Sequence, residues 1–296
     1  MQPFWPRRSP HFLACRQAVR PFDGPAVIGL SGGPDSLALV AAAAAEQKDV
    51  SVMVVDHGLQ PGSADVAERA AAVAREFGFA STVANVTVGP GNVEAAAREA
   101  RYAALLEQGR DVWVAHTADD QAETLLLGAL RGNPSGMAQR NGHIVRPFLN
   151  IRRADTVWAC AELGLEVWND PMNDDPAYRR VAMRQSIIPA LSDLLGGDAV
   201  PALAATANRI AADQALIEQF ADLTPTTSCV ELEGDAGPVR CRRLARWLLD
   251  EGVRVQGDQL AAIEALVTNW RGQGPIAVGG GRSVARIDGK LVLVRA

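Results

Sequence analysis

The chain has 296 residues, 48% of them hydrophobic, with a formal net charge of −5 and only four cysteines. This length suits a large α/β domain plus a smaller one, and the cysteines are too widely spaced to indicate a zinc site or a disulfide framework. No apolar run is long enough to span a membrane, and no apolar segment follows the N-terminal arginines, so we expect a cytoplasmic protein without a membrane anchor.

The basic residues are almost all of one type. Of the 29 basic residues only Lys48 and Lys290 are lysines, which leaves 27 arginines. Arginine binds phosphate bidentately and stacks on bases, so this choice suits a nucleic-acid partner. Genome composition produces the same excess, however, and the negative net charge argues the other way. The arginine content therefore leaves nucleic-acid binding open.

The chain begins with a leader segment that carries one expected helix, residues 11–19, and then reaches its most informative stretch, residues 26–45. A β-branched run predicts a short buried strand, and the alanines that follow predict a helix with Pro34 in its first turn. Between them, Gly32 and Gly33 allow positive φ and a close approach to the backbone, next to the free N–H groups of a helix start. The stretch predicts an anion site, with phosphate as the anion.

The loop sequence, SGGPDS, is neither a Walker loop nor a dinucleotide fingerprint. It resembles the SGGxDS loop of the ATP pyrophosphatase (PP-loop) superfamily, whose members split ATP into AMP and pyrophosphate. The resemblance implies that ATP is bound by Ser31, Gly32, Gly33, Pro34, Asp35 and Ser36, and that Asp35 orients a magnesium ion. The plainer alternative is a strand, turn and helix in which Asp and Ser serve only as helix caps.

Two further strands are expected, over residues 50–55 and 81–88, with a helix between them that runs to about residue 77. The second strand of the chain ends at Asp56, followed by His57. Ligands of open α/β sheets bind at the carboxyl ends of the strands, so Asp56 is a candidate for the nucleotide site. His57 is more typical of a local structural residue than of a base.

A helix capped by Asn92 follows, and it places Glu94, Arg98, Arg101 and Tyr102 on one face. A Glu–Arg pair four residues apart is usually a solvated surface salt bridge. By itself this face is therefore a weak indication of function.

The strand expected over residues 112–115 leads to His116, Asp119, Asp120 and Glu123 at the start of another helix. Acidic side chains at a helix N-terminus are explained by capping and by the helix dipole. Adjacent carboxylates at the carboxyl end of a strand also suit a hard divalent cation that keeps water and substrate phosphates as its other ligands. Both explanations stay open for this cluster.

Taken together, these motifs resemble the tRNA(Ile)-lysidine synthetase family over most of residues 25–190. The resemblance rests on SGGPDS, VDHGL at 55–59, NVEAAAREARY at 92–102, HTADDQAET at 116–124 and LRG at 130–132. Later pieces agree with it: RPFL at 146–149, NDPMND at 169–174 and YRRVAMR at 178–184.

Two departures from the family pattern limit what is carried over. The glycine-rich segment after LRG is short here, and Val181 stands where the family usually has asparagine. The first puts the local loop geometry in doubt, and the second puts in doubt any role assigned around Arg180. Neither departure touches the ATP loop.

The resemblance implies that ATP adenylates the wobble cytidine of the isoleucine tRNA with a CAU anticodon, and that the ε-amine of free L-lysine then displaces AMP. It assigns catalysis to Asp35, Asp120 and Arg98, and it adds Asp56 and His116 to the ATP site. Mg²⁺ would lie at Asp35, Asp119 and Asp120. The tRNA would contact Arg146, Arg152, Arg180 and Arg184, with Arg153 beside them. Lysine, which carries two amines and one carboxylate, would contact Glu123, Asp170 and Asp174.

Beyond residue 191 a long alanine-rich helix, about 199–221, leads to a Thr/Pro-rich boundary, so we expect domains over 1–215 and 216–296. The second domain is expected to contain strand 229–232, helix 239–251, a helix capped by Asp258 and strands 276–278, 283–287 and 291–294. Asp288-Gly289 is a strong hairpin turn for the last pair. Four arginines on one helix predict a broad basic surface: Arg240, Arg242, Arg243 and Arg246. In the family this domain binds substrate; a packing or dimerisation module is the alternative.

The expected fold is therefore α/β: an open parallel sheet with helices on both faces, a helical linker and a small α+β C-terminal domain. Other functions remain open, namely a different PP-loop pyrophosphatase, such as a tRNA thiolase or a small-molecule amide ligase, and a nucleotide-binding sensor without catalysis. Thiolases commonly need paired cysteines, which this chain lacks. The oligomeric state stays open, with a homodimer among the arrangements allowed.

Overall fold

A computed structural model of the chain describes residues 5, 6, 8–58, 62–89, 93–168 and 178–295. The chain divides into two compact units: Met1–Thr124 with Met137–Thr206, and Leu125–Gly136 with Ala207–Ala296. The division between the two units falls within α9 (Val200–Phe220). It also falls within α5 (Ala118–Ala129), whose last part, from Leu125 onward, belongs to the second unit. The domain boundary that the sequence analysis expects near residue 215 rests on composition alone.

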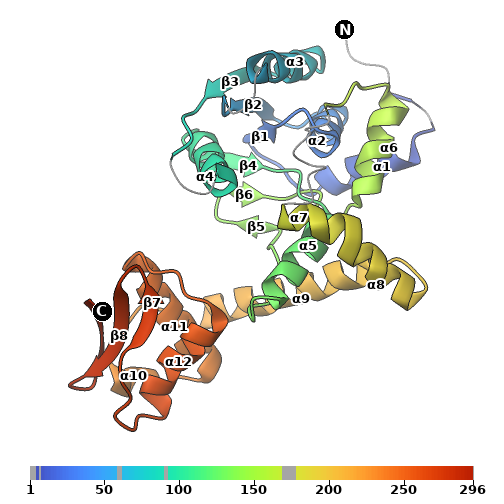
Figure 1. The fold of residues 1–296 in the computed structure, drawn as a ribbon. Coiled ribbons are helices and arrows are strands. Elements are labelled where there is room, and N and C mark those ends of the chain that lie inside the picture. Colours follow the sequence, from blue (N-terminus) through green and yellow to red (C-terminus); the bar gives the residue numbers. More distant parts are fainter. Residues whose placement is uncertain (1–4, 7, 59–61, 90–92, 169–177, 296) are drawn as a thin grey trace. The chain divides into compact units, whose positions relative to one another are not determined.

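The first unit is built on a six-stranded sheet in the order β3-β2-β1-β4-β6-β5 (Figure 1). All pairs are parallel except the edge pair of β5 and β6. The strands are β1 (Ala26–Leu30), β2 (Val50–Asp56), β3 (Ser81–Asn85), β4 (Asp111–Trp113), β5 (Arg140–Asn141) and β6 (Ile144–Val145). The expected open parallel sheet is confirmed apart from the antiparallel edge strand β5, and β3 ends at Asn85 rather than at Val88.

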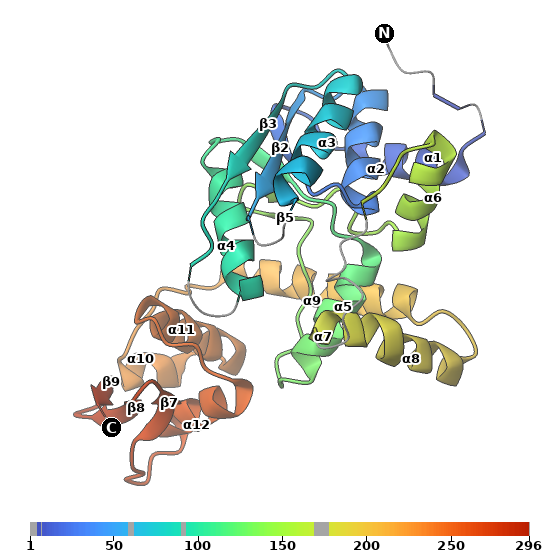
Figure 2. The same ribbon diagram turned by 45° about the horizontal axis from the view of Figure 1, so that its top comes forward.

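Helices cover both faces of the sheet, as Figure 2 shows with α4 on one side and α2 and α3 on the other. The larger core lies on the side of α1 (Pro10–Val19), α2 (Pro34–Ala45), α3 (Ser63–Glu76) and α6 (Arg153–Leu163). On the other side, α4 (Val93–Leu106) inserts Leu105 among Val27, Met53 and Val112. A Cβ atom on Gly29 would lie 3.1 Å from Leu105, so the glycine inside β1 lets α4 pack closely.

Near the end of the first unit, a helix changes its winding where it carries Arg184. A π-helical turn, Met183–Ile187 (η2), joins α7 (Arg179–Ala182) to α8 (Ile188–Leu195). Pro189 lies in the first turn of α8 and has no N–H to donate to the preceding turn, which explains why the regular pattern is interrupted there. The expected segment with Asp170 and Asp174 lies outside the described residues, as does the expected cap Asn92.

The second unit pairs a three-stranded antiparallel sheet with helices. The strands are β7 (Ile276–Gly279), β8 (Arg282–Ile287) and β9 (Lys290–Arg295), and the helices are α10 (Cys229–Gly234), α11 (Gly237–Asp250) and α12 (Gly257–Thr268). Leu244, Leu248 and Ile263 are fully buried in its core. The hairpin turn at Asp288-Gly289 is confirmed, because both residues have positive φ, +49° and +76°.

Three expectations for this unit were wrong. Residues 229–232 form α10 rather than a strand, because the Ser228 hydroxyl caps the helix by accepting from the Glu231 N–H. The cap of α12 is Gln256, in a reciprocal pair with Gln259, rather than Asp258. The basic surface expected on α11 is also narrower than four arginines, because two of the four, Arg242 and Arg246, are the ones that form no ion pair among the described residues.

Two arginines of that surface are occupied within the unit. Arg240 donates to Glu264 over 2.8 Å, and the buried Arg243 donates to Asp235 over 2.8 Å and lies 3.3 Å from Glu231. These two side chains therefore hold the unit together rather than face a partner.

Within the described part of the chain, no single helix is long and apolar enough to cross a membrane. Only Arg179–Leu195 and Val200–Phe220 taken together reach that length and composition, and they are bent by 106° at the break between them.

Candidate active site

The loop after β1 leaves an open, donor-rich turn at the start of α2. Gly32 has φ +83°, a conformation that glycine adopts at low cost, and its carbonyl accepts from the Trp168 N–H over 3.1 Å. The Ser36 hydroxyl accepts from the Ser31 N–H over 3.2 Å and donates to the Gly33 carbonyl over 3.0 Å. The N–H groups of the first helical turn have no intrahelical acceptor. This arrangement is suited to binding phosphate oxygens.

Arg153, at the start of α6, gathers three acidic side chains from two other elements. Its Nη2 donates to Asp120 Oδ1 over 2.7 Å, its Nη1 donates to Glu123 Oε1 over 3.0 Å, and its Nε lies 3.6 Å from Asp35 Oδ2. Asp35 comes from the first turn of α2, whereas the other two acids come from α5. One guanidinium group thus connects the ATP loop with the acidic cluster after β4. The sequence had placed Arg153 only beside the tRNA-binding candidates.

Glu123 is fully buried and accepts from two arginines. Its Oε1 accepts from Arg153 and also from Arg184 Nε, over 2.9 Å, while Oε2 lies 3.9 Å from Arg180 Nη1 and has no hydrogen-bond partner. A buried carboxylate is tolerated only with such compensation. Arg180 and Arg184, expected at the tRNA, therefore lie beside Glu123.

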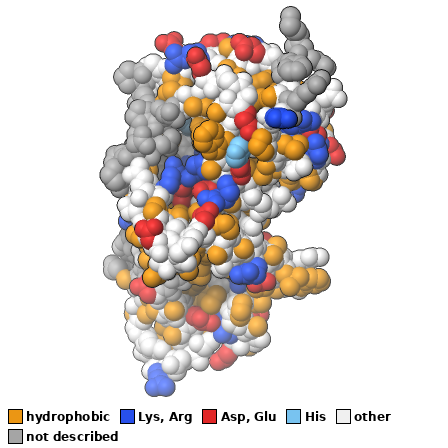
Figure 3. All heavy atoms as spheres, turned by 90° about the vertical axis from the view of Figure 1, so that its right-hand side faces the viewer, with side chains coloured by type: hydrophobic (Ala, Val, Ile, Leu, Met, Phe, Trp, Pro, Cys, Tyr) orange, Lys and Arg blue, Asp and Glu red, His pale blue; other side chains and the backbone are white. Residues whose placement is uncertain are grey.

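Asp119 has a different environment from its neighbour Asp120. Its Oδ2 accepts from the backbone N–H of Arg153 over 2.8 Å and from Arg152 Nε over 3.1 Å, so it caps α6. Arg152 also donates to Asp198. Asp120 instead accepts from both the backbone N–H and the hydroxyl of Thr117, each over 2.8 Å. Figure 3, on the side of α1, α6 and α8, shows basic and acidic side chains interleaved in one patch.

The pKa values of the two carboxyl groups nearest Arg153 move in opposite directions. Burial raises the pKa of Asp35 to about 6, although Arg153 and the Thr156 hydroxyl oppose this. Burial also raises the pKa of Asp120. Arg153, His116 and Thr117 lower this pKa by more, so it lies below the usual range. Neighbouring carboxyls with separated pKa values are typical of sites that do chemistry.

The donor set fits a magnesium ion with few protein ligands. Among the described residues, no group of three or more His, Cys, Asp or Glu side chains is arranged to hold a metal ion. Asp35 and Asp120 provide hard oxygen atoms around one cationic group, although both oxygens of Asp120, like both of Asp119, already accept hydrogen bonds. Mg²⁺ commonly takes one or two carboxylates and completes its shell with water and phosphate. Asp35 and Asp120 differ from Asp119 in that they face the Arg153 guanidinium, whereas Asp119 caps α6; the metal assignment of all three stays a prediction.

A second group of basic side chains comes from α4 and from the residue after β6. Arg98 and Arg101 lie over the Tyr102 ring, 4.9 Å and 5.7 Å from its centre. Arg146, after β6, is buried and donates to the Ala138 carbonyl over 2.8 Å. Burial lowers the pKa of His116 most, and the charges of all three arginines lower it further. Asp56, predicted for the nucleotide, is nearly buried and accepts from the Gly58 N–H over 2.9 Å.

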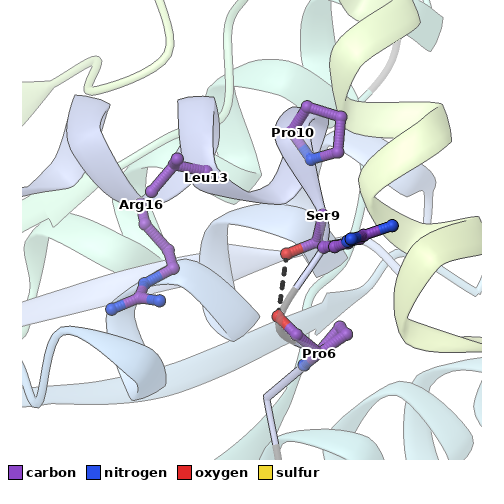
Figure 4. Close-up of a pocket in the computed structure, with 6 residues that line it drawn as sticks. Pro6, Ser9, Pro10, Leu13 and Arg16 are labelled. Carbon is purple, nitrogen blue, oxygen red and sulfur yellow. Dashed lines mark hydrogen bonds between the residues drawn. The ribbon is translucent and has the colours of Figure 1, made fainter.

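A pocket of about 340 Å³ beside α1 contains none of these side chains. In Figure 4 the Ser9 hydroxyl donates to the Pro6 carbonyl at its wall, over 3.2 Å. No acidic side chain that could bind a metal ion or an amine lines this pocket. Its lining residues are Pro6, Arg8, Ser9, Pro10, Leu13 and Arg16. It is therefore not the candidate active site.

Comparisons with known proteins identify relatives of this chain. A family model described as a PP-loop domain matches residues 15–191. The tRNA(Ile)-lysidine synthase of Corynebacterium diphtheriae is 52% identical, with 98% of this chain and 99% of the relative covered, and that of Corynebacterium glutamicum is 50% identical, with 97% and 96% covered.

A solved structure of the U34-tRNA thiolase NcsA from Methanococcus maripaludis superposes with a TM-score of 0.56 at 16% identity. The superposition covers 72% of this chain and 82% of that one. At this identity the likeness shows the fold alone.

Proposed function

The chain belongs to the tRNA(Ile)-lysidine synthase family, and we propose that the loop of residues 31–36 and the acidic side chains gathered by Arg153 are the active site of its reaction. The enzyme ligates lysine to the wobble cytidine of the isoleucine tRNA through an adenylated tRNA intermediate, and it releases AMP and pyrophosphate. The observation that carries the site proposal is the contact of Arg153 with Asp35, Asp120 and Glu123.

The loop and the first turn of α2 bind the ATP phosphates in this proposal. The Ser31 and Ser36 hydroxyls lie 3.1 Å apart and share the turn with the free N–H groups of the helix. Asp56 and His116, at the ends of β2 and β4, lie on the same edge of the sheet and are kept as candidates for the rest of the nucleotide. ATP use itself follows from the PP-loop domain.

We assign Mg²⁺ to Asp35 and Asp120. When bound there, the ion neutralises charge on the pyrophosphate leaving group. Arg153 holds both carboxylates in place and keeps them close to Glu123. It is a positioning residue rather than a catalytic one in this scheme, because every contact described for it is with the protein. The catalytic assignment of Arg98 stays a prediction.

Lysine is assigned to Glu123, whose Oε2 has no hydrogen-bond partner although the side chain is fully buried. A carboxylate oxygen without a partner suits a substrate ammonium group. Arg180 and Arg184 line the same carboxylate. The predicted tRNA contacts of Arg146, Arg152, Arg180 and Arg184 are retained as proposals, although the last three already face acids.

The cysteines argue against a thiolase that depends on a reactive thiol. Cys15, Cys160 and Cys229 are buried, and all four cysteines are unbonded. Burial raises the pKa of Cys160 to about 12 and that of Cys15 still further above its ordinary value. Thiols in that state are not nucleophiles near neutral pH.

The test is release of AMP and pyrophosphate by the full chain with each substrate omitted in turn. We expect release to require both the isoleucine tRNA and lysine, and ATP/pyrophosphate exchange to require the tRNA but not lysine. Release that proceeds with lysine and no tRNA would indicate a small-molecule ligase instead. Transfer of labelled lysine to the tRNA identifies the product.

A further inference from the structure

Three residues on one face of α6 contact the start of α2. Arg153, Thr156 and Cys160 follow one another at spacings of three and four residues, so they lie on the same side of the helix. The Arg153 Nε lies 3.6 Å from Asp35 Oδ2, and the Thr156 hydroxyl donates to Asp35 Oδ1. The Cys160 thiol donates to the Pro34 carbonyl over 3.4 Å. This face of α6 therefore supports the helical turn that carries Asp35.

Thr156 provides the hydrogen bond that orients the Asp35 carboxylate. The distance from Oδ2 to the Arg153 Nε is longer than a hydrogen bond, so Arg153 attracts the carboxylate without fixing its rotation. Among the described residues, no side chain or N–H group other than the Thr156 hydroxyl donates a hydrogen bond to either oxygen of Asp35. A hydroxyl that donates to a carboxylate also stabilises its ionised form.

The Thr156 hydroxyl does not need Asp35 in order to be buried. The side chain is fully buried, and its hydroxyl also lies 2.8 Å from the Arg153 carbonyl, one turn earlier in α6. Threonine commonly donates to a carbonyl three or four residues before it in a helix. Since α6 itself offers an acceptor, the contact with Asp35 is not explained by the burial of the hydroxyl.

We propose that Thr156 is a positioning residue, whose hydroxyl holds Oδ1 of Asp35 so that Oδ2 faces the Arg153 guanidinium. This inference rests on the proposed function, in which Asp35 binds Mg²⁺ at the pyrophosphate leaving group. Carboxylates that bind metal ions are commonly held by hydrogen bonds of this kind, because a ligand that is already oriented loses less freedom when the ion binds. Thr156 itself touches neither the ion nor a substrate in this scheme.

The test uses the full chain with two substitutions at one position. Thr156→Val replaces the hydroxyl with a methyl group, whereas Thr156→Ser keeps the hydroxyl. Thr268→Val is the matched control, because the Thr268 hydroxyl on α12 donates to the Glu264 carbonyl over 3.2 Å and to no carboxylate among the described residues. Asp35→Asn is measured beside them.

Three quantities are measured for each protein. The first is the melting temperature without ligand. The second is the affinity for Mn²⁺, by electron paramagnetic resonance, with an ATP analogue that has a methylene group between its α and β phosphorus atoms. The third is the rate of AMP release as a function of magnesium and of lysine concentration.

We expect Thr156→Val to bind Mn²⁺ about tenfold more weakly and to need about tenfold more magnesium for half-maximal rate, as for the loss of one hydrogen bond to a charged group. The KM for lysine should stay the same, because the hydroxyl faces Asp35 rather than Glu123. Thr156→Ser should restore both metal measurements. The melting temperature should change no more than in Thr268→Val, since the methyl group fills the space of the hydroxyl.

The proposal is overturned if Thr156→Val matches Thr268→Val in both metal measurements, whatever its melting temperature, because Thr156 would then only support the fold. It is also overturned if Thr156→Ser loses as much as Thr156→Val, since the hydroxyl would not be the group that acts. Failure of the proposed function gives a different result, in which Asp35→Asn itself binds Mn²⁺ like the wild type. The metal assignment of Asp35 then falls, and the role of Thr156 falls with it.

Discussion

Two groups of arginines lie at the carboxyl edge of the same sheet and have opposite surroundings. Arg152, Arg153 and Arg184 are paired with Asp119, Asp120, Asp35 and Glu123. Among the described residues, Arg98 and Arg101 lie over the Tyr102 ring and Arg146 donates to the Ala138 carbonyl, and none of the three pairs with a carboxylate.

The difference teaches that charge alone does not assign a role to an arginine. In the paired group, the guanidinium charges keep carboxylates close together inside the protein. These arginines therefore bind side chains of the protein itself. In the unpaired group, no carboxylate of the described residues takes up the guanidinium charges. The predictions below test this contrast, from the largest expected effect to the smallest.

Asp35→Asn should lower the rate of AMP release by about 10³-fold, because it removes a carboxylate proposed to hold the metal ion at the leaving group. The amide keeps the size of the side chain and still accepts from Thr156. The melting temperature should therefore not fall. Near-normal AMP release by a well-folded variant would contradict the role of Asp35.

Glu123→Gln should destabilise the paired group most, by about 3 to 5 kcal/mol, because it leaves Arg153 and Arg184 without their shared buried carboxylate. Chemical denaturation measures the loss. The double variant Glu123→Gln with Arg184→Met should recover part of it. If the single variant is as stable as the wild type, the ion pairs do not hold this part of the site.

Asp120→Asn should raise the magnesium concentration needed for half-maximal rate, since one of two proposed ligands loses its charge. Binding of Mn²⁺ to the variant, followed by electron paramagnetic resonance, gives the same information without turnover. Asp119→Asn is the control, because Asp119 caps α6 and contacts Arg152 rather than the Arg153 guanidinium. Equal magnesium curves for all three proteins would mean that Asp120 is only a helix cap.

The pH dependence should reveal the raised pKa of Asp35, about 6 in the folded protein. Activity that needs the ionised carboxylate should fall as the pH drops through 6. The ordinary value is 3.8, so the folded state binds this proton more tightly than the unfolded chain does, and stability falls as the pH rises from 3.8 through about 6.

Melting temperatures of the wild type and Asp35→Asn, compared at pH 4 and pH 7, check the second point. The melting temperature of Asp35→Asn, relative to that of the wild type, should be higher at pH 7 than at pH 4. A constant difference between the two proteins would show that Asp35 titrates normally.

Arg184→Ala is expected to have the smallest effect of these variants. It tests whether Arg184 pairs with an acid of the protein or with tRNA phosphate. If its main partner is Glu123, the variant should melt at a lower temperature and keep the salt dependence of tRNA binding. If it contacts tRNA phosphate, the salt slope should fall by about 0.7 to 0.9. An unaltered slope with a lower melting temperature removes Arg184 from the tRNA assignment.

The amino-acid sequence by itself determined the parts of this protein that depend on neighbouring residues. The SGGPDS loop between a buried strand and an alanine-rich helix predicted the turn at Gly32, and the acidic run after β4 predicted carboxylates at the same edge. Strand periodicity and the Asp288-Gly289 turn predicted the last hairpin. These features follow from backbone preferences and from the alternation of strands and helices, which act over a few residues.

Only the tertiary structure decided which charges meet. Arg153 contacts Asp120 from 33 positions away and Glu123 from 30, and no local pattern distinguishes it from Arg152. The helix at Cys229–Gly234 likewise depends on a cap by Ser228 and on the Cys229 N–H donating to the Gly289 carbonyl. Ion pairs and burial are set by packing between distant segments, so the sequence supplied the arginines and the fold separated the paired group from the unpaired one.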